Sequence, residues 1–212
     1  NGTINTSSKG YDGGEGPGKA TPDGSQWTGG GGYGGVGGSG TGSSIGGLTY
    51  GSITAPINLG SGSADNIYGN GAAGGGAVYL NVTDTLILNG TILADGSPGV
   101  DRAANNGGGS GGSIYIIAET IGGTGNITAD GGAPVDSNDG GGGGGRIAIY
   151  HTNDNSSFGK VTAFGGGTGA RGGGPGTIFR KETSQTYGNL TIDNNIKSTS
   201  PSIVPSPVHI PI

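Results

Sequence analysis

One short stretch of this chain comes close to a phosphate-binding loop. Residues 13–19 read GGEGPGK, which approaches the pattern G-x-x-x-x-G-K-[ST], in which backbone amides cradle a phosphate. Ala20 stands where that pattern needs Ser or Thr, and neither an apolar strand nor a helical pattern flanks the loop. In a chain with 56 glycines such a match arises by chance. We therefore do not interpret it as a nucleotide site.

A second stretch is an acidic turn that contains Asp136, Asn138 and Asp139. Oxygen ligands of this kind hold calcium, the only cofactor that the sequence suggests, but the spacing D-S-N-D-G is not that of an EF-hand loop. Asx turns explain these residues better. Three further aspartates recur at matching positions after repeated strands: Asp95, Asp130 and Asp193. This recurrence predicts a repeated turn role and not a pair of catalytic carboxylates.

The charged residues do not form a catalytic cluster in the sequence. Cleavage of polysaccharides needs grouped carboxylates with Arg or Lys nearby, whereas the nine basic residues here are scattered. His151 and His209 have no assignable partner, and Arg146 is expected to cap carbonyls or to meet an acidic turn. The net charge of −5 disfavours nucleic acid as a ligand, and no apolar run is long enough for a membrane span. The sequence predicts that the protein is not an enzyme.

Sequons point to a location outside the cell. Seven N-x-S/T sites are candidates for N-glycosylation: Asn1, Asn5, Asn81, Asn89, Asn126, Asn155 and Asn189. In a chain this rich in Asn and Thr, the alternative is that these residues serve as turn and strand residues. The sequence leaves both interpretations open.

The sequence repeats with a period of about 33 residues, and this repeat is expected to set the positions of the turns and strands that carry the polar residues above. Glycine runs recur at 74–76, 107–112, 140–145 and 172–176, and each leads into an alternating apolar strand. The apolar residues fall in columns: Val78, Ile114, Ile147 and Ile178 in one, Ile92, Ile127, Val161 and Leu190 in another. Because the glycine runs keep a constant phase, we expect them to be ordered in a polyglycine II-like conformation and not to be flexible linkers.

These patterns predict an all-β protein, a parallel β-helix or β-solenoid with stacked polyglycine II-like segments. The solenoid domain is expected to cover residues 1–197, with an irregular insertion at 11–73 and regular coils at 74–195. A Pro-rich extended segment, residues 198–212, follows as a linker or as an arm that docks on another subunit. The apolar residues of this candidate assembly arm are Ile203, Val204, Val208, Ile210 and Ile212.

The cycle GGGSGGSIYIIAETIGGTGNITADGG, with GGGGGGRIAIY after it, resembles the glycine-rich β-helical repeat regions of secreted, cell-surface and adhesin-like microbial proteins. The resemblance implies an extracellular protein with a structural or adhesive role. We expect a self-assembling filament or sheath subunit, or an adhesin stalk, whose partners are copies of itself, head-to-tail or by strand addition, together with surface glycans. A carbohydrate-binding or polysaccharide-cleaving domain is the first alternative, and an ice-binding protein is the second.

Overall fold

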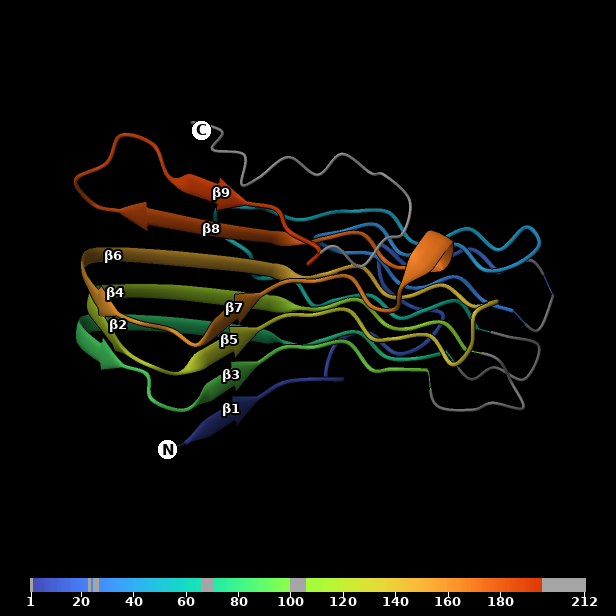
Figure 1. The fold of residues 1–212 in the computed structure, drawn as a ribbon, viewed down its shortest axis with the longest axis horizontal. Coiled ribbons are helices and arrows are strands. Elements are labelled where there is room, and N and C mark those ends of the chain that lie inside the picture. Colours follow the sequence, from blue (N-terminus) through green and yellow to red (C-terminus); the bar gives the residue numbers. More distant parts are fainter. Residues whose placement is uncertain (1, 23, 25–26, 66–70, 100–105, 196–212) are drawn as a thin grey trace.

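Two β-sheets make up the regular part of the computed structural model, which describes residues 2–22, 24, 27–65, 71–99 and 106–195 (Figure 1). One sheet is parallel and has the order β1-β3-β5-β7, from the short strands Thr3–Asn5, Thr91–Leu93, Asn126–Thr128 and Lys160–Thr162. The other has the order β2-β4-β6-β8-β9, from the strands Ala77–Ile87, Ser113–Gly123, Arg146–Ser156, Thr177–Glu182 and Asn189–Thr191. A turn of 3₁₀ helix spans Gly169–Arg171.

The long strands β2, β4, β6 and β8 pair in parallel, in the register that the apolar columns predicted. Val78 lies opposite Ile114, Ile114 opposite Ile147, and Ile147 opposite Ile178. Alternate residues of each strand point to opposite faces of the sheet, so these columns form one continuous apolar face. The prediction of the column Val78, Ile114, Ile147 and Ile178 is confirmed.

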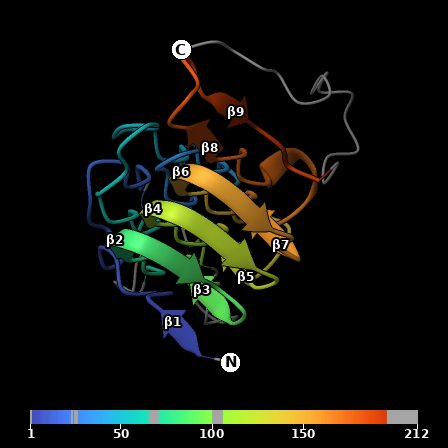
Figure 2. The same ribbon diagram turned by 90° about the vertical axis from the view of Figure 1, so that its left-hand side faces the viewer.

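The hydrophobic core lies between the two sheets. Ile92 and Ile127 of the short strands join Ile114, Ile147 and Ile149 of the long strands in a single buried cluster. Burial of each such side chain contributes roughly 1.5–3 kcal/mol. Figure 2 shows that the two sheets lie side by side and that their strands stack in the same direction.

The glycine runs form a bundle of extended segments beside the sheets (Figure 1). Residues 140–145 show its geometry, because their amide donors cycle through three neighbours. Gly140 and Gly143 donate to residues 28 and 31, Gly141 and Gly144 to 171 and 174, and Gly142 and Gly145 to 132 and 129, over N–O distances of 2.7–3.0 Å. A repeat of three is the period of the polyproline II conformation.

The carbonyls of the same segment accept from other neighbours. Gly140 and Gly143 accept from Gly108 and Gly111, Gly141 and Gly144 from Gly38 and Gly35, and Gly142 from Gly166. The segment is thus surrounded by backbone on all sides, and its buried polar groups are paired as an interior requires. A Cβ atom on any residue from 140 to 145 would overlap a backbone oxygen of a neighbouring segment. No side chain fits at these six positions.

The prediction of a parallel β-solenoid is wrong. The described residues form two separate sheets with no closed coil, and the five-stranded sheet is mixed because β9 runs antiparallel to β8. The glycine runs of the repeats do not pack only against one another. Segments 29–38 and 60–64, from the stretch predicted as an irregular insertion, lie among them and hydrogen-bond to them. The repeats were read correctly as strands, but the sequence does not reveal how segments outside the repeats interleave with the glycines.

The position predicted for Leu190 is also wrong. Its motif matches the short strands, yet Leu190 lies opposite Phe179 of β8 and not beside β7. The short strands β3, β5 and β7 begin 14, 13 and 14 residues after the start of the preceding long strand, whereas β9 begins 12 residues after the start of β8. β8 is also shorter than the other long strands. The chain therefore turns back before it reaches the other sheet.

Candidate functional site

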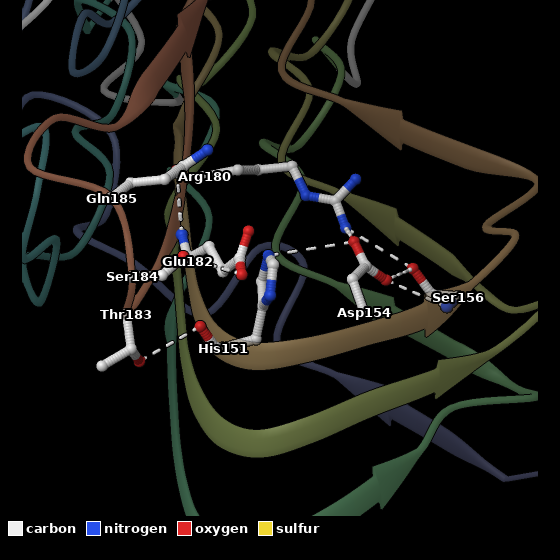
Figure 3. Close-up of polar contacts among 8 residues, drawn as sticks. All are labelled: His151, Asp154, Ser156, Arg180, Glu182, Thr183, Ser184 and Gln185. Carbon is white, nitrogen blue, oxygen red and sulfur yellow. Dashed lines mark hydrogen bonds and ion pairs between the residues drawn. The ribbon is translucent and has the colours of Figure 1, made fainter.

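The most concentrated group of polar side chains lies where β6 and β8 run side by side (Figure 3). Arg180 Nη2 of β8 donates to Asp154 Oδ2 of β6 over 2.8 Å, and His151 Nε2 lies 3.8 Å from the same oxygen. Ser156 donates to Asp154 Oδ1 twice, from its hydroxyl over 2.6 Å and from its amide over 2.9 Å. Partial burial opposes ionisation of Asp154, but the Ser156 hydrogen bonds and the charges of Arg180 and His151 outweigh it, so the pKa of Asp154 is lowered.

This arrangement is an ion-pair network and does not have the geometry of a nucleophilic relay. A serine nucleophile is activated when its hydroxyl donates to an imidazole, whereas the Ser156 hydroxyl donates to a carboxylate. His151 is 8% exposed, and its Nδ1 is buried with no hydrogen-bond partner among the described residues. The sequence did not predict the pairing of His151 with Asp154. Their spacing of three residues was the available signal.

Neighbouring contacts fix the turn between β8 and β9. The Thr183 amide and hydroxyl both donate to the His151 carbonyl, over 2.8 and 3.2 Å. Within the turn, Glu182 N donates to Gln185 Oε1 and Ser184 Oγ donates to Glu182 Oε1 (Figure 3). These contacts hold the turn against the middle of β6, which indicates a structural role for the cluster.

The other notable group is a buried carboxylate inside the glycine bundle. Asp139 is fully buried, its Oδ1 accepts from Thr28 N over 3.0 Å, and its Oδ2 has no hydrogen-bond partner among the described residues. Thr28 in turn accepts from Gly107 N at its hydroxyl and from Gly140 N at its carbonyl. Burial raises the pKa of Asp139 to about 6. Asp139 and Thr28 therefore tie three segments of the bundle together.

The acidic turn does not present its oxygens as one calcium shell. Asp136 Oδ1 accepts from Asn138 N over 2.6 Å, which is an Asx turn, while Asp139 faces Thr28. Thr41 donates to Asn138 from both its amide and its hydroxyl. In the described part of the chain, no three His, Cys, Asp or Glu side chains gather as a metal-binding group.

The recurring aspartates form a ladder along the short sheet. Asp95 Oδ1 accepts from Asp130 N over 2.7 Å, and Asp130 Oδ1 accepts from Phe164 N over 2.6 Å. Their Oδ2 atoms accept from Thr128 and Thr162 in the same order. Asp193 is not part of this ladder and accepts from Asn195 within its own turn. Asp95 and Asp130 thus link successive strands, beyond the local turns that the sequence predicted.

Arg146 caps carbonyls, which is one of its two predicted roles. Its guanidinium donates to the carbonyls of Tyr50 and Tyr33 and to Thr177, and it lies over the Tyr33 ring. Tyr33 also exchanges a hydrogen bond of 2.6 Å with Ser113 of β4. This buried junction fastens the N-terminal glycine segments to the long sheet. Sequence reasoning missed it, although Tyr33 stands out as an isolated aromatic residue in a glycine run.

The candidate modification sites lie on the surface or beyond the described residues. Five sequon asparagines are exposed: Asn5, Asn81, Asn89, Asn155 and Asn189. Asn126 is half-buried, and Asn1 lies outside the described residues. The predicted assembly arm, with Ile203, Val204, Val208, Ile210 and Ile212, also lies outside them, as does His209.

Comparison with protein-family models, with curated proteins and with solved structures finds no match to this chain. Among the described residues no helix has the length and hydrophobicity needed to cross a bilayer.

Proposed function

We propose that this chain is an extracellular structural protein that functions by associating with copies of itself, as a subunit of a filament or sheath or as an adhesin stalk. The observation that carries the proposal is the glycine bundle. Its interior is mainly backbone hydrogen-bonded to backbone, with no space for a Cβ at residues 140–145. Such a body supplies rigidity and shape, and it presents few side chains that could bind or transform a ligand.

The polar clusters support the same proposal. Asp154, Arg180 and Thr183 bind one strand or turn to the next, and Asp139 binds bundle segments together. The ionisable groups Asp154, Arg180 and Asp139 are each engaged in holding the fold.

The exposed sequons support an extracellular location. The Asn5, Asn81 and Asn155 side chains are accessible to a modifying enzyme in the folded protein. Mass spectrometry of the protein secreted from its native source tests this part of the proposal, with glycan mass expected on exposed sequon asparagines. A secreted protein that carries no glycan at any sequon would remove this support.

Electron microscopy and sedimentation of the purified protein test self-association directly. We expect multimers or elongated assemblies whose population rises with concentration. Discrete monomers at every concentration would contradict the proposal. Turnover of acidic polysaccharides that is abolished by Asp154→Asn would replace it with an enzymatic function.

A further inference from the structure

An antiparallel pair of segments lies at the surface of the glycine bundle. Gly37 N donates to Gly47 O over 2.8 Å, and Gly40 N donates to Ser44 O over 3.1 Å, so residues of the two segments pair in reverse order. We call the four residues that this order sets opposite one another the uncharged face: Val36 with Leu48, and Ser39 with Ile45.

Segment 45–48 reads I-G-G-L, which fits a conformation with three residues per turn. A Cβ on Gly46 or Gly47 would overlap a backbone oxygen of a neighbouring segment, so these two directions face the bundle. Ile45 and Leu48 point in the third direction and are 60% and 71% exposed. Solvent therefore meets apolar side chains at the outer positions of this segment.

Segment 36–39 reads V-G-G-S and follows the same rule. A Cβ on Gly37 or Gly38 would also overlap a neighbouring carbonyl oxygen, whereas Val36 is 48% exposed and Ser39 is exposed. Outer side chains that are three residues apart lie about 9 Å apart along each segment. The uncharged face therefore has two rows of side chains, with only glycine backbone between them.

The sequence around this face carries no charge. Residues 24–64 contain no Asp, Glu, Lys, Arg or His, so all nine basic and all fourteen acidic residues lie elsewhere in the chain. A protein surface ordinarily has about 25–35% charged residues. Arg171 marks the border of the face, because its guanidinium donates to the Ser39 carbonyl over 3.4 Å. An apolar centre with a charged border is the usual composition of a protein–protein interface.

The charge distribution favours a second copy of this chain as the partner. Each copy has a net charge of −5, which opposes contact between copies through most of their surface. The uncharged face is where two copies can meet without facing like charges, and it offers no charge to an acidic or basic partner. Its side-chain rows also match the glycine rows of an identical face. All seven sequons lie outside residues 24–64, so the segments that form this face carry no glycan.

We propose that two copies of this chain associate through the uncharged face about a two-fold axis. This inference rests on the proposed self-association and names the surface through which it occurs. Val36, Ile45 and Leu48 of each copy become buried against the same residues of the other, as an isologous interface requires. Removal of these apolar side chains from water drives the association.

Light scattering after size-exclusion chromatography, across a concentration series of the secreted protein, tests this contact. Leu48→Lys and Ile45→Lys each place a charge at the centre of the interface, and each is expected to weaken association at least about tenfold. Tyr187→Lys is the matched control, because it changes the net charge equally and Tyr187 is 57% exposed in the turn between β8 and β9. Circular dichroism checks that each variant remains folded.

The response to salt gives a second readout. Apolar contact between two negatively charged copies should tighten as sodium chloride rises from about 0.05 to 0.5 M, because salt screens the repulsion between them. Association that weakens over this range, as an interface of ion pairs does, would overturn the inference.

Thiol labelling identifies what covers the face, since the chain has no cysteine of its own. In dilute protein, Leu48→Cys should react with a maleimide as fast as Tyr187→Cys does, and only Leu48→Cys should slow as the concentration rises. Slow labelling of Leu48→Cys at every dilution would show that another part of the same chain covers the face. That result, or association that Leu48→Lys leaves unchanged, would overturn the inference and leave the proposed function standing. Monomers at every concentration would overturn both.

Discussion

At the scale of single residues, the close packing of the glycine bundle can be tested by substituting alanine at two neighbouring glycines, Gly172 and Gly173. A Cβ on Gly173 would overlap the carbonyl oxygen of Gly142, whereas a Cβ on Gly172 meets its nearest atom, Gly169 O, at an ordinary contact distance of 3.4 Å. We expect Gly173→Ala to lower the free energy of unfolding by about 3 kcal/mol or more, as overpacking against backbone does, and Gly172→Ala to change it by less than about 1 kcal/mol. Urea denaturation of both variants measures the difference, and equal effects would contradict the bundle.

The burial of Asp139 predicts a specific pH dependence of the free energy of unfolding. Burial raises the pKa of Asp139 from its ordinary 3.8 to about 6, so the folded protein holds this proton more tightly than the unfolded chain does. The stabilisation is fully present below about pH 3.8 and is lost as the pH rises through about 6, a difference of about 3 kcal/mol.

Denaturation at a series of pH values measures this dependence. Asp139→Asn should remove the fall in stability between pH 4 and 6 and should be more stable than the wild type above pH 7. Asp84→Asn, which changes an exposed carboxylate, is the control and should keep the wild-type profile. If the Asp139→Asn profile parallels that of the wild type, Asp139 is not the group responsible.

At the scale of elements, the aspartate ladder should contribute measurably to pairing along the short sheet. Asp130→Ala leaves the Phe164 amide and the Thr162 hydroxyl without their acceptor, which typically costs about 1–3 kcal/mol. Asp193→Ala removes an exposed contact within one turn and should cost less than about 0.5 kcal/mol. Thermal and chemical denaturation compare the two, and a similar loss in both would show that the ladder adds nothing.

The sequence predicted the elements better than their arrangement. Alternating residues and constant glycine phase located β2, β4, β6 and β8 and gave their register, because period two and repeat spacing are local properties. They did not predict the reversal of β9, which follows a long strand of only six residues, or the contact between Thr28 and Asp139, which are 111 residues apart. The fold class was wrong for the same reason: glycine carries no side-chain pattern from which its neighbours can be read.

At the scale of the whole molecule, the bundle predicts an unusual distribution of amide protection. The amides of Gly141–Gly145 are buried and hydrogen-bonded although no strand or helix contains them. They should exchange with solvent only through large-scale opening, as slowly as the amides of Ile147 and Ile149 in β6. Nuclear magnetic resonance measures these rates, and rapid exchange across the bundle would contradict its order.

An interior built from peptide groups also alters how stability responds to temperature. Exposure of apolar surface raises the heat capacity on unfolding and exposure of polar surface lowers it, with a net of about 12–15 cal/mol/K per residue in ordinary globular proteins. Unfolding of this bundle hydrates mainly amides, because 56 of the 212 residues are glycine. Calorimetry should therefore give a heat-capacity change per residue clearly below that range. A smaller value flattens the stability curve, so the protein should keep its fold over a wider span of warm and cold conditions than its few apolar side chains would suggest.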